Sequence, residues 1–334
     1  MMTKREFTQT HKAIDFKFYQ NEDDFKVLEK PIRFTNRGNF IIMKIKKRNL
    51  GTWDLLDSLA KGLKVYESEL GYAGLKDKNA TTTQYISIPR KYVKDLKKFK
   101  HPKIEILETF LHSTKLNIGD LVSNSFEINL HEVKEEDVYK IEKLLKQISK
   151  IGMPNYFGYQ RFGFDGDENL DKARKYIYED LIIKDKKISK MLVAQYQSDF
   201  FNKWLVQRLK LSKDEFKLLS GDVFRVYKTD KFFTPKNLTD VIIEDFKNKK
   251  IVPTGLLPGR QAFRAIGEAR KIEENFDDTY IQEKGFRRDA IVYPTDISVK
   301  FDNETSKCKV KFTLPKASYA TVLIENIANR NLRV

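Results

Sequence analysis

The chain has 334 residues, 40% of them hydrophobic and 33% charged, which is typical of a soluble globular protein with one large domain or two ordinary ones. Its 63 Lys and Arg exceed its 47 Asp and Glu by 16 charges, which favours a nucleic-acid partner, although lysine-rich composition alone also produces a basic solvated surface. The single Cys308 excludes an intramolecular disulfide, and the lack of an apolar leader or an 18-residue apolar run predicts a cytoplasmic chain that does not cross a membrane.

The first part of the chain mixes strand and helix patterns. Hydrophobic side chains alternate over residues 41–46, as in a half-buried strand, and Lys44–Arg48 gives that strand a basic end. An amphipathic helix follows, with Thr52 as its expected N-cap and Leu56, Leu59 and Leu63 on one stripe. Further elements are predicted as strands at 85–88, 104–111 and 125–130 and as a helix at 135–150.

A glycine-punctuated stretch, Gly71–Gln84, joins that first helix to the strand at 85–88. Gly71 and Gly74 allow a sharp turn or a close approach of the backbone to a ligand. Asp77 therefore lies at a junction between elements, where a scaffold can present a side chain into a cleft. Local sequence alone favours an ordinary surface turn, because Asp and Asn are common in turns and Lys76–Asn79 is strongly polar.

A basic segment follows this junction. Residues 90–103 contain seven Lys or Arg and one Asp, interleaved with aromatic side chains. The pattern is typical of a surface that tracks phosphates, and a solvated amphipathic helix fits it about as well.

The second half of the chain changes character at Pro154–Gly163, an aromatic loop punctuated by glycine, and a rigid-turn loop is predicted at 253–259. Helices are predicted at 169–178, 189–211, 237–247, 262–275 and 319–328, and strands at 290–293, 297–299 and 309–312. This order predicts an α+β fold in which a helix-rich segment interrupts one domain. The terminal strands would then close the sheet that begins before residue 150.

Four stretches, in order and at sensible spacing, resemble the signatures of the TruD family of tRNA pseudouridine synthases. They are Gly71–Lys78, Pro154–Gly163, Thr254–Gly259 and Leu314–Leu323. In the third, Leu256 stands where relatives commonly have Pro. One such motif would be suggestive, whereas four in sequence make coincidence improbable.

The resemblance implies a pseudouridine-synthase catalytic core, with a mixed or antiparallel sheet, interrupted by a TruD insertion domain. The implied ranges are 1–154 and 286–334 for the catalytic domain and 155–285 for the insertion. The implied activity is the conversion of uridine to pseudouridine in tRNA, at position 13 in bacterial members. No cofactor, no metal, no membrane and a monomeric state are expected, and the four His show no metal-ligand spacing.

The resemblance also implies roles for individual residues. Asp77 matches the catalytic aspartate of the family. The positions that match contacts to the target nucleotide are Phe25, Asn124 and Tyr319. Tyr319 is commonly Phe in relatives, and its added hydroxyl should leave stacking intact. Phe126 and Lys76 match motif positions of less certain role.

The chemistry is consistent with a lone carboxylate. Breaking the N1–C1′ bond and forming C5–C1′ needs a nucleophile but no redox step, and carboxylates serve as nucleophiles at sugar carbons. Attack at C1′, attack on the base and a glycal route all remain open. Each needs an ionised Asp77, so we expect a nearby cation, with Lys17, Lys76 and Arg161 as candidates.

The target C1′ cannot be reached inside a stacked helix, so the nucleotide must flip out. Phe25 and Tyr319 could stack on the flipped base, and Asn124 could bond a uracil edge or a ribose hydroxyl. A non-catalytic RNA-binding module remains the rival hypothesis. A methyltransferase would need a glycine-rich cofactor loop, and the chain contains no G-x-G-x-x-G run.

Overall fold

The computed structural model describes residues 4–8, 10–96, 98–163, 165–212 and 215–332. They form two compact units. Within the described ranges, the sheet unit comprises residues 15–146 and 294–317, and the helical unit comprises residues 4–14, 147–293 and 318–332. The division into a catalytic domain (1–154 and 286–334) and an insertion (155–285) stays a prediction. The chain passes from one compact unit to the other at different positions, after residues 14, 146, 293 and 317.

The sheet unit is built on one large mixed sheet with the strand order β14-β15-β7-β2-β5-β3-β6. Strands β2 and β5 run parallel, and the other neighbours in this order run antiparallel. The strands are β2 (Phe25–Pro31), β3 (Phe40–Arg48), β5 (Thr81–Pro89), β6 (Ile104–His112), β7 (Leu121–His131), β14 (Thr295–Asp302) and β15 (Lys307–Pro315), with the short β1 (Lys17–Phe18) and β4 (Gly71–Tyr72) attached to β7 and β5.

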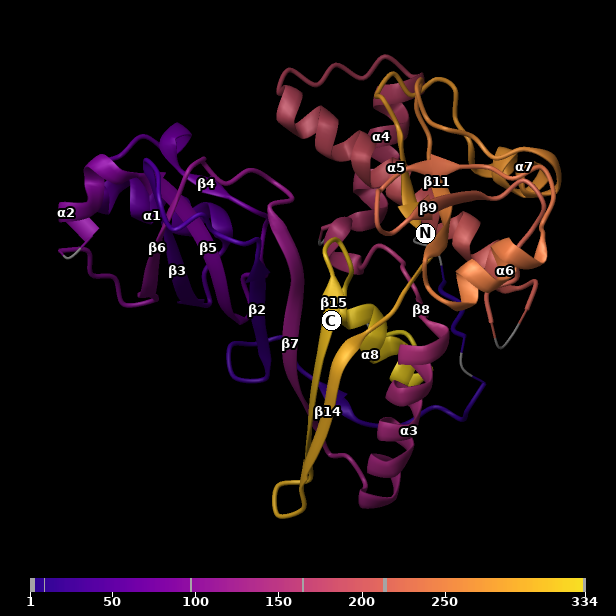
Figure 1. Ribbon diagram of the computed structural model, residues 1–334, viewed down its shortest axis with the longest axis horizontal. Helices are drawn as coiled ribbons and strands as arrows, with labels where there is room; N and C mark the ends of the chain where they lie inside the picture. The colour runs from indigo at the N-terminus through magenta and orange to yellow at the C-terminus, as the bar shows by residue number, and fades with distance from the viewer. Residues whose placement is uncertain (1–3, 9, 97, 164, 213–214, 333–334) are drawn as a thin grey trace. The chain divides into compact units, whose positions relative to one another are not determined.

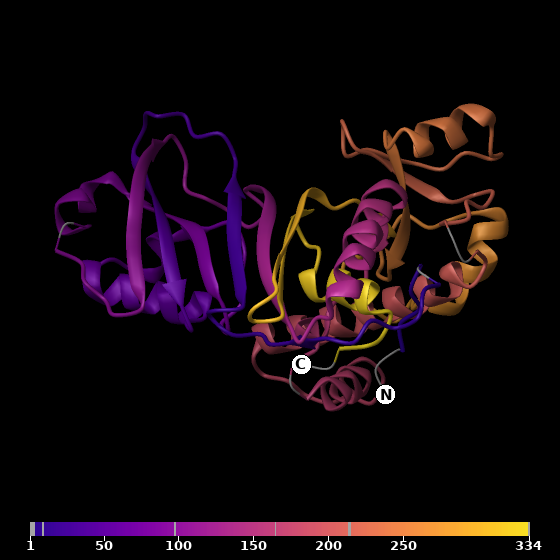
Figure 2. The ribbon, with the colours of Figure 1, turned by 90° about the horizontal axis from the view of Figure 1, so that it is seen from below.

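The expected closure of this sheet by strands from the end of the chain is confirmed for two of three segments. Figure 1 shows β15 beside β7, and Figure 2 shows the same neighbours from below. Alternate residues of β15 are buried, so the strand fits a sheet with one covered face. The third segment instead forms β13 (Ile291–Val292), which pairs with β8 (Met153–Pro154) in the helical unit.

Helix α1 (Thr52–Leu63) covers one face of the sheet with its leucine stripe. Leu55, Leu56, Leu59 and Leu63 pack against Ile41, Met43 and Ile45 of β3 and against Ile86 and Ile88 of β5. The prediction that Thr52 caps this helix is wrong, because the N-cap is Gly51. The Thr52 hydroxyl instead accepts a hydrogen bond from the backbone N–H of Lys76, 24 residues further on.

The basic segment 90–103 contains a 3₁₀ turn followed by α2 (Val93–Leu96), and Lys97 lies outside the described residues. Tyr92, Leu96 and Phe99 pack on the core beneath α1. The exposed Lys91 pairs with Glu69 at 2.8 Å. This arrangement favours the interpretation as a solvated amphipathic segment.

The helical unit combines α4 (Gly166–Tyr178), α5 (Lys186–Leu209), α6 (Asp240–Lys247), α7 (Gly267–Glu273) and α8 (Ala320–Ala328) with a sheet of order β10-β9-β11-β12. The strands are β9 (Val223–Val226), β10 (Phe232–Phe233), β11 (Ile251–Leu257) and β12 (Phe286–Asp289), and α3 (Glu135–Ile151) runs from the sheet unit into this one.

Much of the predicted loop at 253–259 is therefore a strand. Gly255 explains the difference, because a Cβ there would lie 2.3 Å from the ring of Trp204 in α5. No helix in the described part of the chain is long and apolar enough to cross a membrane.

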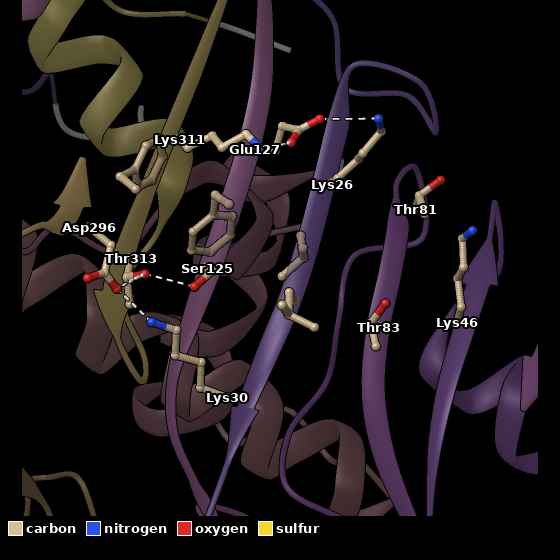
Figure 3. Close-up of a pocket in the computed structure, with 14 residues that line it drawn as sticks. Lys26, Lys30, Lys46, Thr81, Thr83, Ser125, Glu127, Asp296, Lys311 and Thr313 are labelled. Atoms are coloured by element: carbon tan, nitrogen blue, oxygen red, sulfur yellow. Dashed lines mark hydrogen bonds and ion pairs between the residues drawn. The ribbon is translucent and has the colours of Figure 1, made fainter. Parts of the chain in front are cut away.

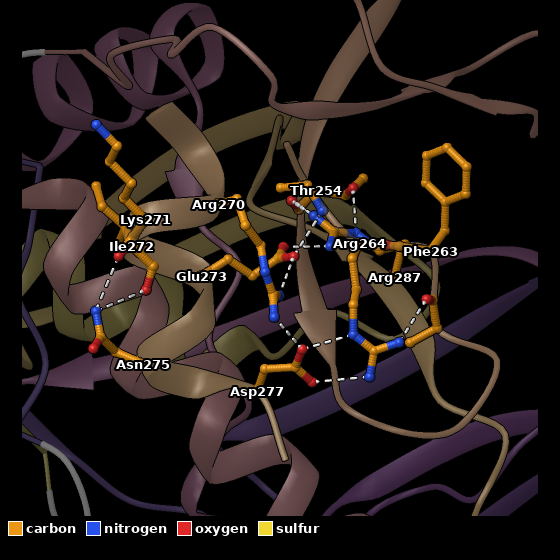
Figure 4. A network of polar contacts seen from close by, with 12 residues as sticks. Thr254, Phe263, Arg264, Arg270, Lys271, Ile272, Glu273, Asn275, Asp277 and Arg287 are labelled. Atoms are coloured by element: carbon orange, nitrogen blue, oxygen red, sulfur yellow. Dashed lines mark hydrogen bonds and ion pairs between the residues drawn. The ribbon is translucent and has the colours of Figure 1, made fainter. Parts of the chain in front are cut away.

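A buried polar network joins α7 to this sheet (Figure 4). The Glu273 carboxylate, 1% exposed, forms an ion pair with the buried Arg287 and accepts hydrogen bonds from Ala265 N at 2.8 Å and Arg270 at 3.3 Å. Arg287 also donates to the Thr254 hydroxyl at 3.0 Å. Glu273 therefore compensates a buried guanidinium and satisfies a backbone N–H at once.

Replacing Glu273 by Ala should lower the free energy of unfolding by about 3–5 kcal/mol, because Arg287 would be left buried without its counter-ion. Urea unfolding measures this loss. The matched control is Glu274→Ala, which removes an exposed neighbour and should change stability by less than about 0.5 kcal/mol. Equal stability of the two variants would contradict the structural role given to Glu273.

Candidate active site

The loop that carries Asp77 runs from the end of β4 to the start of β5, and hydrogen bonds hold it along its length. Ala73 O accepts from Gly119 N at 2.7 Å, Lys76 N donates to the Thr52 hydroxyl at 2.9 Å, and Asp77 O accepts from Lys47 Nζ at 2.8 Å. These bonds come from distant parts of the sheet unit. The loop is therefore held by tertiary contacts, unlike a free surface turn.

Of the two glycines in this motif, Gly71 is the one that the structure requires. A Cβ on Gly71 would lie 2.4 Å from Leu116 O and from the Ser87 hydroxyl, so the backbone passes too close for any side chain. A Cβ on Gly74 would meet only the flexible end of Lys76, at 3.5 Å. Gly71 is thus needed for close packing of the loop against the sheet unit, and the close approach to a ligand that the sequence suggested stays a prediction.

The Asp77 side chain is half-buried. Gln20 Nε2, from the segment between β1 and β2, donates to Asp77 Oδ1 at 3.3 Å. Gln20 was not predicted from the sequence, where it lies in a polar loop with no motif around it. Its contact orients one oxygen of the Asp77 carboxylate.

The buried cation beside Asp77 is Lys47, at the end of β3. Its side chain is fully buried, and Nζ donates to Leu50 O at 2.5 Å as well as to Asp77 O. Burial lowers the pKa of Lys47 to about 8, and the negative charge of Asp77 opposes this shift. Lys47 therefore supplies positive charge directly behind the loop.

The three expected cations have other partners in the structure. Lys17 pairs with Glu132 at 2.5 Å, and Lys76 pairs with the buried Glu29 at 2.5 Å. Arg161 belongs to the helical unit, where it donates to the Ser198 hydroxyl at 3.1 Å. A signal for Lys47 was present, because it continues the alternation of Ile41, Met43 and Ile45 on the buried face of its strand.

The structure places Lys76 and Asn124 close to each other through Glu29. Glu29 on β2 lies directly opposite Asn124 on β7, so their side chains share the face that Lys76 reaches. Burial raises the pKa of Glu29, and the Lys76 ammonium opposes that rise. Asn124 Oδ1 is buried and accepts no hydrogen bond from any residue within the described ranges. A ligand that donates a hydrogen bond would satisfy it.

Phe25 and Phe126 lie on this same sheet face. Phe126 is opposite Val27, two residues along β2 from Phe25, and the two rings meet edge to face with centroids 6.1 Å apart. Phe126 also stacks on Phe312 of β15 at 5.4 Å. Both rings are mostly buried, so they form an aromatic floor beside Asn124.

Tyr319, the remaining expected contact, belongs to the helical unit and precedes α8. A Cβ on Gly158 would lie 2.6 Å from the Tyr319 ring, and Phe157 meets that ring edge to face at 6.3 Å. Gly158 and Phe157 belong to the motif Pro154–Gly163. Two sequence motifs that are far apart in the chain therefore pack together in this unit.

Comparison with known proteins is consistent with these motifs. The model of the family described as tRNA pseudouridine synthase D (TruD) matches residues 2–169 and 168–327. The chain belongs to this family of tRNA pseudouridine synthases. A tRNA pseudouridine synthase D from Nitratiruptor is 39% identical, covering 98% of this chain and 99% of the relative, and one from Wolinella succinogenes is 38% identical, covering 99% of both.

The fold of this TruD-family member agrees with a solved structure as well. A crystal structure of a TruD-family protein from Methanosarcina mazei superposes with a TM-score of 0.73 over 98% of this chain and 96% of the other, at 22% sequence identity. The expected α+β class, with a mixed sheet and a pseudouridine-synthase fold, is confirmed. Within the described residues, no cluster of three or more His, Cys, Asp or Glu side chains could hold a metal ion.

Proposed function

We propose that this member of the tRNA pseudouridine synthase D family isomerises uridine to pseudouridine in tRNA with Asp77 as its nucleophile. The observation that carries the proposal is the position of Asp77. It lies on a loop held by Thr52, Lys47 and Gly119, in a chain that matches the family model almost throughout. Lys47 behind the loop favours the ionised carboxylate that a nucleophile requires.

The reaction rearranges bonds within one nucleotide. The N1–C1′ bond breaks, the base turns while it is held, and a C5–C1′ bond forms as the proton on C5 is lost and N1 gains one. No redox equivalent or external energy is consumed. As the nucleophile, Asp77 uses its electron pair to form a transient bond to the nucleotide. That pair returns to the carboxylate when the bond breaks, and the protein holds the detached uracil until C5 faces the sugar.

The flipped uridine is proposed to bind among the residues that the family resemblance implies. Asn124 Oδ1, buried and without a protein donor in the described part of the chain, suits a uracil N–H or a ribose hydroxyl. Phe25 and Phe126 form the apolar floor beside it. Lys76, held by Glu29, contributes positive charge at the edge of the floor. Tyr319 is proposed to stack on the base.

The proposed target is the uridine at position 13 of tRNA, and the chain is proposed to act as a monomer in the cytoplasm. Incubation of the purified protein with unmodified tRNA transcripts, followed by chemical mapping of pseudouridine, tests the target. We expect one new pseudouridine at position 13 and none in a transcript with cytidine there. Product at another uridine alone would reject the position, and no product in any tRNA would reject the activity.

The role of Tyr319 is tested by a pair of substitutions. Tyr319→Phe keeps the ring and should retain activity, whereas Tyr319→Ala should lower kcat/KM by about 5–150-fold, equivalent to about 1–3 kcal/mol of stacking. Single-turnover assays at several tRNA concentrations measure both. Because Tyr319 also packs on Gly158, thermal unfolding of each variant serves as the control. Equal activities of a folded Ala variant and the Phe variant would remove Tyr319 from the base pocket.

A further inference from the structure

The face of the large sheet opposite Asn124 carries a lysine-rich groove. Side chains alternate along a strand, so Lys26, Leu28 and Lys30 of β2 point away from the face that holds Phe25 and Glu29. A groove of about 470 Å³ lies there, and Figure 3 shows the side chains that line it. Among the described residues assigned to the active site, Phe126 alone also lines this groove, and strand alternation turns its side chain toward the opposite face.

The charges in this groove are unbalanced. Three lysines converge on one carboxylate, because Glu127 lies 3.3 Å from Lys26, 3.3 Å from Lys309 and 2.6 Å from Lys311. Although burial raises the pKa of Glu127, hydrogen bonds and charge from these lysines lower it to about 2. Two positive charges remain uncompensated around a single point, which favours the approach of an anion.

The groove extends across neighbouring strands. The register aligns Lys311 of β15, Glu127 of β7, Lys26 of β2, Thr81 of β5 and Arg48 of β3 in one transverse row. Strands lie about 4.8 Å apart, so this row spans roughly 19 Å. The lysine side chains that contact Glu127 are 40–46% exposed, so a ligand can reach them. Hydroxyls of Ser125, Thr83 and Thr313 line the adjoining row.

We propose that this groove binds the phosphodiester backbone of the RNA substrate, as a second contact surface on the sheet face turned away from Asn124. The inference rests on the proposed function, since it assigns the groove to the same tRNA. A row of cations with an excess of charge suits a polymer of regularly spaced phosphates better than one small anion. The Thr83 hydroxyl adds a hydrogen-bond donor for phosphate oxygens, whereas the Ser125 and Thr313 hydroxyls bond each other at 2.7 Å.

The test compares two sets of lysine variants. Lys26→Gln, Lys30→Gln and Lys311→Gln are combined, and the control combines Lys140→Gln with Lys146→Gln, two exposed lysines of α3 that are also paired with carboxylates. Filter binding to full-length tRNA between 50 and 200 mM salt gives the Kd of each. We expect the groove variant to bind at least about 10-fold more weakly, with the slope of log Kd against log salt reduced by about 2–3. The groove variant should also have a lower kcat/KM, because its KM rises while its kcat is unchanged.

Glu127→Gln provides a variant with the opposite expected effect. It removes the carboxylate that neutralises the lysines, so tRNA should bind a few-fold more tightly. Identical Kd values and salt slopes for the groove variant and the control would overturn the inference while leaving the proposed function intact. Wild-type protein that binds tRNA but forms no pseudouridine would instead reject the function. If the groove variant loses affinity for a free nucleoside triphosphate but keeps its affinity for tRNA, the groove binds a small anion and the RNA proposal is overturned.

Discussion

Replacing Asp77 by Asn is expected to leave tRNA binding unchanged and to reduce pseudouridine formation by about 10⁴-fold or more, the scale seen when a catalytic nucleophile is lost. Asn is nearly isosteric with Asp, and its amide oxygen can still accept the hydrogen bond from Gln20. The backbone carbonyl that contacts Lys47 is unaffected. The variant therefore removes the charge and nucleophilicity of the carboxylate and keeps both of these contacts.

Single-turnover assays with excess enzyme measure the rate, and filter binding measures the affinity. Asp77→Ala should behave in the same way, which guards against slow deamidation of the Asn variant. Asp57→Asn is the matched control, because Asp57 lies on the exposed side of α1 and pairs only with Lys61 among the contacts described. Undiminished product from both Asp77 variants would eliminate the proposed nucleophile and leave a non-catalytic RNA-binding role as the better hypothesis.

Replacing Lys47 by Met is expected to lower the rate of pseudouridine formation by about 100-fold, because a misplacement of about 1 Å at a reacting group can cost that much. The change removes the donor that holds Asp77 O and the positive charge behind the loop. Met fills a similar volume, and burial of the lysine charge is itself costly, so stability should fall little or rise. Lys44→Met is the control, on the same strand but paired with Glu108 near the surface.

The pH dependence of the reaction separates a role of charge from a role in packing. The pKa of Lys47 is about 8 in the folded chain and 10.5 ordinarily, with Asp77 and Asp54 favouring the protonated form and Lys76 opposing it. The single-turnover rate should therefore fall as the pH rises through about 8. Between about pH 8 and 10.5 the unfolded chain binds the extra proton, so the stability contributed by this group rises over the same interval.

Activity and stability should thus change in opposite directions as the pH rises. The fall in rate above about pH 8 should be absent from Lys47→Met. In Lys47→Arg it should shift to a much higher pH, because the guanidinium stays protonated. A Met variant with the wild-type rate and the wild-type pH dependence would show that Lys47 only fills space. A lower rate with an unchanged pH dependence would assign Lys47 a positioning role through its hydrogen bond alone.

Periodicity predicted the regular elements well where hydrophobic residues recur on one face. The strand at 41–46 became β3 and the helix at 135–150 became α3, because each buries a regularly spaced stripe of hydrophobic residues, and β3 also buries Ile42 on its other face. The segment around Thr254 was predicted as a loop, since Pro253, Gly255 and Pro258 normally break structure. In the fold Gly255 makes room for Trp204, a contact that no local pattern reveals.

The sequence alone established the family, the fold class and the residue proposed as nucleophile. Each of these follows from the four motifs, which depend only on residue type and order along the chain. The tertiary structure alone decided which cation lies behind Asp77. Lys17, Lys76 and Lys47 are chemically alike, and their pairing depends on which carboxylates and carbonyl groups the folded backbone brings within reach. Lys47 lies there because strand alternation turns it inward, toward Asp77, which lies 30 residues further along the chain.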